Sequence, residues 1–223
     1  MPTTAPPPTD RTRVRRLPDR GVYDRPVIDV ILDEALVCHL GFVAAGQPFG
    51  IPTIHARVAD AVYVHGSAAS RMLRHLRDGV PACVTATLVD GLVLARSAFH
   101  HSLNYRSVVV LGTATEVVSP DERLAALEAI VEHVVPGRWD EVRPPNAREL
   151  KATMVLRVPI TEASAKVRTG GPIDDEEDLA LACWAGVLPL RLAAAAPVPD
   201  ARLPGGTAVP VTVREYRRAR AAP

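Results

Sequence analysis

Three short segments of this 223-residue sequence carry side chains that could hold a charged organic ligand. In the first, residues 63–71, an apolar alternation ends at Gly66 and is followed by Ser67, Ser70 and Arg71. Backbone N–H groups at a helix start, hydroxyls and a guanidinium are the donors that bind phosphate. The segment therefore predicts a phosphate cradle. Ordinary helix capping by Ser67, with Arg71 on the surface, is the alternative that the pattern leaves open.

The second segment, residues 96–107, places two histidines, two arginines, three serines, an asparagine and a tyrosine between two apolar runs. Loops carried by rigid strands are common positions for binding sites, so this segment is a second candidate. Its adjacent histidines, His100 and His101, face opposite ways if the chain is extended. A metal ion bound by both is therefore not predicted.

The third segment, residues 52–57, puts His55 and Arg57 on one face of a predicted strand. A histidine in a barrel strand is more often a satisfied core residue than a catalyst, and we interpret His55 in that way. The sequence contains no GxGxxG, Walker, HExxH or GxSxG motif. It is therefore not a standard dinucleotide-binding enzyme, P-loop NTPase, zincin or α/β-hydrolase.

The elements that position these segments follow from apolar periodicity and turn residues. Helices are predicted from Pro26 to about residue 35, over 67–77, from the N-cap Ser119 onward and around 146–151. Glu122, three residues after Ser119, predicts a capping box, and the acidic run 174–178 could begin another helix. The predicted strands are 36–44, 49–58, 61–66, 80–89, 92–99, 105–118 and 153–165, with Asp90-Gly91 as a hairpin turn.

Antiparallel strands with helices inserted between them indicate an α+β fold that is mainly β. The short turns favour a barrel, and we expect a six-stranded antiparallel split β-barrel with flanking helices. The domain boundaries follow from composition. Residues 1–20 are a flexible, Pro- and Arg-rich arm, 21–190 are the barrel domain, and 191–223 are an extension rich in Ala, Pro and Arg.

Composition limits the classes of function. The formal net charge is +1, which gives no electrostatic reason to expect a nucleic acid or a membrane as partner. No run of about 18 apolar residues and no secretory signal occurs, so we expect a cytoplasmic protein. The three cysteines, Cys38, Cys83 and Cys183, share no CxxC spacing, so they are interpreted as idle thiols in a reducing compartment.

With these segments in this order, the sequence resembles the pyridoxamine 5′-phosphate oxidase-like FMN-binding split-barrel superfamily. Within it, the sequence is most similar to the bacterial flavin-nucleotide-binding branch, which includes the nitroimidazole-resistance reductases. The resemblance covers about residues 12 to 190 and rests on the order and spacing of its motifs. The matching stretches are residues 31–35, 51–53, 63–71, 90–97, 100–109, 164–168 and 184–187.

The resemblance implies that FMN lies along the strand that ends at Gly66, with its phosphate held by Ser70 and Arg71. His65 stands where the resistance reductases have a histidine beside the flavin, so it is the catalytic candidate and could donate a proton. The full set of FMN-binding residues implied by the resemblance is Pro52, Thr53, Ile54, Val64, His65, Gly66, Ser67, Ser70, Arg71, Arg106, Ser107, Lys166 and Trp184.

The resemblance has two further implications for single residues. Arg106-Ser107 stands where the oxidases have an Arg-Gln pair, and Ser107 in place of glutamine is a departure from the family pattern. Lys166, Arg168 and Trp184 would come from the second subunit of a homodimer to close the site. No metal ligand is predicted.

The predicted function is that of an FMN-dependent oxidoreductase that acts on a small organic substrate, with NADH, NADPH or another electron donor. A flavin store or sensor without turnover is an alternative, and so is a haem-binding or deazaflavin-binding member of the same fold. Oxidation of pyridoxamine phosphate itself is not predicted. The C-terminal Arg-x-His signature of the true oxidases is missing, and the tail reads Arg217-Arg218-Ala219-Arg220.

Overall fold

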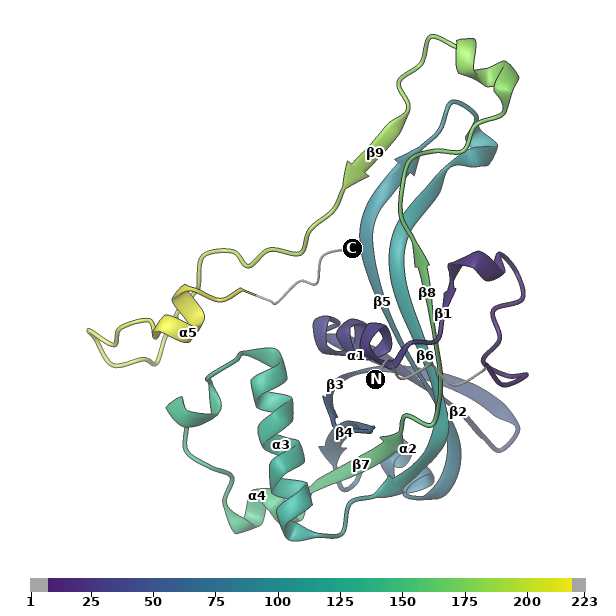
Figure 1. Cartoon of the computed structure of the whole chain (residues 1–223). Helices are drawn as coiled ribbons and strands as arrows, with labels where there is room; N and C mark the ends of the chain where they lie inside the picture. The colour runs from purple at the N-terminus through teal and green to yellow at the C-terminus, as the bar shows by residue number, and fades with distance from the viewer. Residues whose placement is uncertain (1–7, 218–223) are drawn as a thin grey trace, which may run out of the picture.

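A ring of six antiparallel strands forms the centre of the molecule in the computed structural model, which describes residues 8–217. The ring order is β6-β7-β4-β3-β2-β5, and pairing of β5 with β6 closes it (Figure 1). The expected six-stranded split barrel is therefore confirmed. Strands β8 and β1 extend the sheet beyond β6, and β9 extends it beyond β5. The strands are β1 Gly21–Val22, β2 Val37–Ala44, β3 Gln47–Val58, β4 Ala61–Ser67, β5 Asp78–Leu94, β6 Ser102–Glu116, β7 Thr153–Pro159, β8 Glu162–Arg168 and β9 Gly186–Pro189.

Four of the helices pack against strands of the barrel. Helix α1 begins with Pro26 in its first turn, as predicted, and buries Ile28, Ile31 and Leu32 against the core. The helices are α1 Arg25–Glu34, α2 Arg71–Leu76, α3 Pro120–Val134, α4 Ala147–Ala152 and α5 Val211–Arg214, and the short 3-10 turns are η1 Pro18–Arg20, η2 Ala98–His100, η3 Trp139–Glu141 and η4 Glu176–Ala180.

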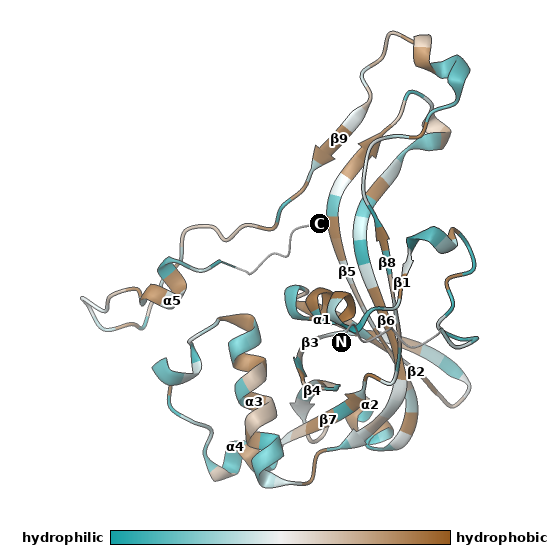
Figure 2. Cartoon of the chain, viewed as in Figure 1, coloured by the Kyte–Doolittle hydropathy of each residue, from teal (hydrophilic) through white to brown (hydrophobic). Residues whose placement is uncertain are grey.

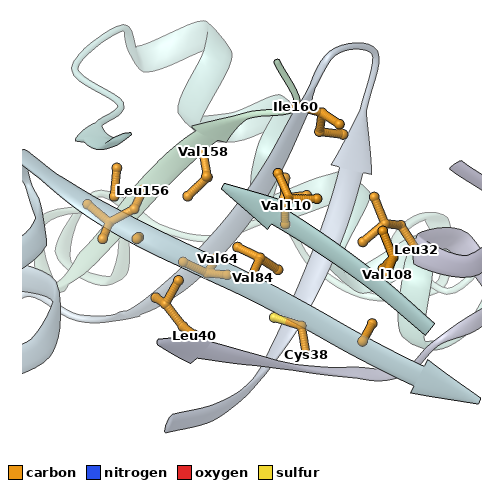
Figure 3. Close-up of a cluster of buried hydrophobic side chains, with 14 of the residues drawn as sticks. Leu32, Cys38, Leu40, Val64, Val84, Val108, Val110, Leu156, Val158 and Ile160 are labelled. Atoms are coloured by element: carbon orange, nitrogen blue, oxygen red, sulfur yellow. The ribbon is translucent and has the colours of Figure 1, made fainter. Parts of the chain in front are cut away.

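Alternation along the strands divides the sheet into an inner and an outer face. Val64, Val84, Val110 and Leu156 are fully buried and converge inside the barrel (Figure 3). Figure 2 shows the matching alternation of polar and apolar residues along β5 and β6. Burial of such side chains contributes about 1.5–3 kcal/mol each, which makes this cluster the main source of stability.

The predicted turn at Asp90-Gly91 is wrong. Strand β5 continues through these residues with a bulge between Val89 and Gly91, because β6 stays paired with it as far as Ser102. The chain reverses only around η2, so β5 and β6 form an arm that projects from the barrel (Figure 1). Strand β9 lies against Gly91, where an added Cβ would stand 3.0 Å from Val187 Cγ1.

Two of the expected helix starts differ in detail. Ser119 caps α3 as predicted, but Glu122 does not complete a capping box, because its carboxylate accepts a hydrogen bond of 2.9 Å from the Tyr63 hydroxyl. The acidic run forms only the turn η4. Asp174 accepts hydrogen bonds of 2.8 Å from the backbone N and the guanidinium of Arg96, which ties this run to the projecting arm.

The N-terminal and C-terminal parts of the chain are described only in part. Residues 1–7 of the predicted arm and residues 218–223 of the predicted extension lie outside the described residues. Thr12, within the predicted arm, is buried. No helix of the described part of the chain is long and apolar enough to cross a membrane. Burial raises the pKa of the Cys38 thiol to about 12, which agrees with its interpretation as an idle group.

Candidate functional site

A cavity of about 570 Å³ lies between the β2–β3 hairpin and α2, beside the strand-to-helix junction that was predicted to bind phosphate. Its floor is aromatic, since the rings of Phe42 and Phe49 stack with centroids 5.3 Å apart and an interplanar angle of 14°. These two residues face each other across the turn that joins β2 and β3. The cavity is lined by Phe42, Ala44, Ala45, Phe49, Ile51, Ser70, Arg71, Met72 and His75.

Arg71 places a positive charge at this cavity. Its guanidinium carbon lies 5.7 Å from the centroid of the Phe49 ring, which is a cation–π distance. Within residues 8–217, no carboxylate oxygen lies within 4.0 Å of its nitrogens, in contrast to most other arginines near the barrel. The charge of Arg71 is therefore available to an anionic ligand in the cavity.

The two serines of the junction cap the local backbone. Ser70 is the N-cap of α2 and accepts a hydrogen bond from Leu73 N, and Ser67 accepts one from Ala69 N. Ser70, and not Ser67 as the capping alternative had it, therefore caps the helix, whereas Arg71 is exposed, as that alternative expected. The hydroxyl hydrogen of Ser70, which lines the cavity, can still be donated to a ligand. Gly66 packs closely on α2, because an added Cβ would stand 3.1 Å from Leu73 Cδ1.

His65 lies in a different hollow. Strand β4 turns this side chain away from the barrel interior, toward α3, where a cleft of about 430 Å³ opens. The cleft is mainly apolar, and its lining includes the ion pair of Arg143 and Glu149. Its lining residues are His65, Leu127, Ile130, Val131, Trp139, Val142, Arg143, Pro145, Glu149 and Thr153.

The environment of His65 keeps its imidazole neutral. Desolvation lowers the pKa of His65 below its ordinary value of 6.5, and its buried Nδ1 has no hydrogen-bond partner among the described residues. Neutral imidazole is the form that binds a metal ion, whereas an imidazolium proton donor is disfavoured here. Within one chain, His65 and Arg71 line separate cavities.

Four of the predicted residues share the outer face of the sheet. Pro52 pairs with His39 of β2, which in turn pairs with Thr85 of β5, and Ser107 of β6 pairs with Lys166 of β8. Ile54 lies two residues beyond Pro52 on the same strand and is 39% exposed. The register thus places Pro52, Ile54, Ser107 and Lys166 on one outer surface.

The remaining predicted residues lie elsewhere. Val64 is fully buried in the barrel core, and Arg106 is buried with its guanidinium bound by Glu34 and Asp90, so neither lines the cavity at Arg71 or the His65 cleft. The even-numbered positions of β4 and β6 point inward, and flavin contact by these two residues stays a prediction. Thr53 is half-buried and donates a hydrogen bond to the Ile54 carbonyl, and Trp184 lies on the projecting arm, 68% exposed.

Several residues that line the cavity or the cleft were not predicted from the sequence. Phe42 and Phe49 form the cavity floor, and they are two of the three phenylalanines in the chain. Their symmetric position about the Ala45-Gly46 turn was a signal that strand pairing could have used. Trp139 and Arg143 of the cleft lie in an irregular segment between α3 and α4, where periodicity carries no information.

His55, by contrast, is the satisfied core residue that was predicted. It is fully buried, and its Nε2 lies 2.9 Å from the carbonyl oxygen of Leu32 at the end of α1. Its ring also packs on that of His133, with centroids 4.8 Å apart.

The comparison with known families decides the identity of the fold. The family model for pyridoxamine 5′-phosphate oxidase matches residues 24–167, which is more than half of the chain. The chain belongs to the pyridoxamine 5′-phosphate oxidase family. The resemblance inferred from the sequence motifs is thereby confirmed. No curated protein matches this chain.

Solved structures include two similar members over nearly the whole chain. The flavocytochrome Anf3 from Azotobacter vinelandii is 40% identical, with a TM-score of 0.88 over 95% of this chain and 99% of that one. The FAD and heme binding protein from Mycobacterium smegmatis is 36% identical, with a TM-score of 0.84 over 88% and 96% of the two chains. A 5-nitroimidazole antibiotic resistance protein from Bacteroides thetaiotaomicron, 21% identical with a TM-score of 0.55 over 66% and 86%, shares the fold.

Proposed function

We propose that this family member is a flavin-binding redox protein and that its flavin nucleotide occupies the cavity between α2 and the β2–β3 hairpin. The observation that carries the proposal is Arg71, a guanidinium with no carboxylate partner in the described chain, at the edge of a 570 Å³ cavity with a stacked aromatic floor. A flavin nucleotide has a flat ring system and a doubly charged phosphate, and these surroundings suit both. The names of the two relatives above 30% identity, a flavocytochrome and an FAD and heme binding protein, support a flavin.

In this site the chain itself binds and orients the nucleotide. Arg71 would donate charge-assisted hydrogen bonds to the phosphate, and the Ser70 hydroxyl would donate a further one. Phe42, Phe49 and Met72 would exclude water from the ring system. When bound, the flavin supplies transfer of electrons or hydride, which we propose runs from NADH or NADPH to a small organic substrate.

The sequence motifs indicate FMN, whereas the name of the Mycobacterium smegmatis relative indicates FAD for that protein. The cavity suits the ring system and the first phosphate, which the two nucleotides share. We propose FMN as the ligand of this cavity, and mass spectrometry of the cofactor released from purified protein decides between the two nucleotides and a deazaflavin.

Calorimetric titration with FMN and with FAD tests the cavity. Arg71→Ala should weaken binding roughly 10-fold to 150-fold, the value of a charge-assisted hydrogen bond of about 1.5–3 kcal/mol. Arg74→Ala is the matched control, because Arg74 lies on the same helix, does not line the cavity and, among residues 8–217, donates a side-chain hydrogen bond to the Ala68 carbonyl alone. Equal flavin affinity of both variants and the wild type would remove the cavity from the proposal.

Stopped-flow reduction of the loaded protein by NADH or NADPH separates an oxidoreductase from a flavin store or sensor. Rapid bleaching of the flavin absorbance supports turnover. A flavin that stays oxidised with both nucleotides, although it can be reduced by dithionite, supports the store or sensor.

We further propose a homodimer with the outer sheet face as its interface. Ile54 and Val37 pair across β2 and β3 on this face, and both are more than a third exposed. Exposed apolar side chains that form a continuous surface commonly mark an interface between proteins. Such an interface would bring Pro52, Ser107 and Lys166 of one subunit toward its partner, as the family resemblance implies.

The His65 cleft is a candidate site for a second cofactor. The neutral imidazole of His65, in a mainly apolar hollow of about 430 Å³, is a donor that would suit haem iron. The names of both relatives include haem or a cytochrome. We propose that haem, when bound, occupies this cleft with His65 as its ligand, and that it supplies one-electron transfer.

Titration of the purified protein with haemin, followed by its Soret absorbance, tests the second cofactor. His65→Leu should abolish or strongly shift the band of the bound haem. His101→Leu is the control, since His101 is an exposed histidine of the projecting arm, lies outside the cleft lining and has its ring Nδ1 3.0 Å from the Ser97 carbonyl oxygen. An identical Soret spectrum for His65→Leu and wild type would contradict the assignment of His65.

A further inference from the structure

The C-terminal segment leaves the sheet and later returns to the body of the molecule. After β9, residues 191–209 are exposed throughout, and the chain then forms the short helix α5 (Figure 1). At α5 the exposure falls, and Pro210, Thr212 and Val213 are half-buried. The segment therefore makes a localised contact after a long exposed stretch.

That contact is made with the irregular segment between α3 and α4. The Thr212 hydroxyl donates a hydrogen bond of 2.7 Å to Glu141 Oε2. The Thr212 methyl group packs on Gly137, where an added Cβ would stand 3.0 Å from Thr212 Cγ2. Glu141 also accepts a hydrogen bond of 2.9 Å from Arg138, and the hydrogen bonds from Thr212 and Arg138 hold the pKa of the Glu141 carboxyl below its ordinary range.

The same irregular segment forms the outer wall of the His65 cleft. Trp139, Val142 and Arg143 line the cleft, and Glu141 lies directly before Val142 in the chain. The start of this wall is held to the end of α3, because the Glu132 carboxylate accepts hydrogen bonds of 2.6 Å from Gly137 N and 2.7 Å from Trp139 N. Its end is held by ion pairing of Arg143 with Glu149. Between these two anchors, Thr212 provides a contact from outside the segment.

We propose that Thr212 and Glu141 are positioning residues, and that the C-terminal segment acts as a strap that holds the outer wall of the cleft over His65. The proposal rests on the proposed function only in taking the cleft as a ligand site. Because coupling between two contacts is reciprocal, a ligand that fills the cleft and needs the wall in place also stabilises the docked strap.

Hydrogen exchange of the unliganded full-length protein tests the strap without any cofactor. In Thr212→Val, which keeps the shape and loses the hydroxyl, amides of residues 137–143 should exchange at least 3-fold faster than in the wild type. Thr212→Ser should restore slow exchange, because it keeps the donor. Thr207→Val is the control, since the Thr207 hydroxyl donates only within the strap, to the Pro204 carbonyl at 2.7 Å.

The second readout is acrylamide quenching of Trp139 fluorescence in a Trp184→Phe background, since these are the two tryptophans of the chain and Trp139 lines the cleft. If the wall loosens in Thr212→Val, quenching of Trp139 should increase, whereas Thr212→Ser should be quenched like the wild type. Unchanged exchange and unchanged quenching in Thr212→Val would overturn the strap. Failure of haemin to bind the wild type would instead overturn the haem assignment, and these two readouts would still decide the strap.

Discussion

The guanidinium of Arg106 donates hydrogen bonds of 2.5 and 2.8 Å to the two carboxylate oxygens of Glu34, inside the sheet where both side chains are nearly buried. Asp90, at the bulge of β5, accepts two further hydrogen bonds of 2.9 Å from the same guanidinium. The ion triad joins the end of α1 to β5 and β6. Its carboxylates raise the pKa of Arg106 above the ordinary arginine value, so the group stays charged.

Removal of one carboxylate from this triad should destabilise the fold. Glu34→Gln leaves Arg106 with one anion, and we expect a loss of about 2 kcal/mol, below the roughly 3–5 kcal/mol for a buried charge that loses its sole partner. Urea unfolding followed by circular dichroism measures the change. In the control Asp60→Asn, the side chain is 83% exposed, and its loss should change stability by less than about 0.5 kcal/mol. Equal stability of the two variants would show that the triad contributes nothing.

The buried His65 should make stability depend on pH. Its folded pKa lies below the unfolded value of 6.5, so between these two values the unfolded chain binds more protons than the folded one. Above pH 6.5 this histidine should therefore not lower the free energy of unfolding. As the pH falls from 6.5 toward the folded pKa, the free energy of unfolding should decrease. Unfolding midpoints in urea, measured between pH 7.5 and pH 5 (roughly the range of histidine titration), should fall less steeply in His65→Gln than in the wild type. Parallel pH profiles would contradict the desolvation of His65.

Gly112 should not tolerate a side chain. Strand β6 approaches β7 closely here, and an added Cβ would stand 2.9 Å from the Pro159 carbonyl oxygen and from Val158 Cγ1. Gly112→Ala should lower the free energy of unfolding by about 1–3 kcal/mol, as expected for overpacking. Gly50→Ala is the control, because apart from its chain neighbours no atom of the described residues lies within 4 Å of an added Cβ. This substitution should change the free energy of unfolding by less than about 1 kcal/mol. Thermal unfolding of both variants measures the difference.

The proposed dimer predicts a solution mass of twice the 23.9 kDa of one chain. Ile54→Arg places a charge in the middle of the proposed interface, so light scattering at micromolar concentration should show a shift toward monomer. Leu124→Arg, on the 40% exposed Leu124 of α3, should leave the mass unchanged. A wild-type monomer that still binds flavin tightly would refute the interface site.

Much of the fold could be predicted because local patterns matched it. Pro26 and Ser119 mark the starts of α1 and α3, and alternation outlines the barrel strands. The error at Asp90-Gly91 arose because a dipeptide that favours a tight turn also fits a bulge, and only pairing with β6 and β9 chose between them. Likewise, the sequence placed the Glu122 carboxylate near the backbone N–H of the Ser119 cap, three residues away. In the folded chain this carboxylate instead accepts a hydrogen bond from Tyr63, which is distant in the sequence.

The sequence by itself determined the family, the ring of strands and the inert role of His55, since each depends on residue order and on short-range periodicity. Only the tertiary structure decided which polar residues share a cavity. Neighbours along a strand face opposite sides, so Val64 and His65 are separated by the sheet, whereas Phe42 and Phe49 are brought together by strand pairing. Arg106 and Arg71 look equally available in the sequence. Their roles differ because folding places two carboxylates around Arg106 and places Arg71 beside an aromatic ring and a cavity.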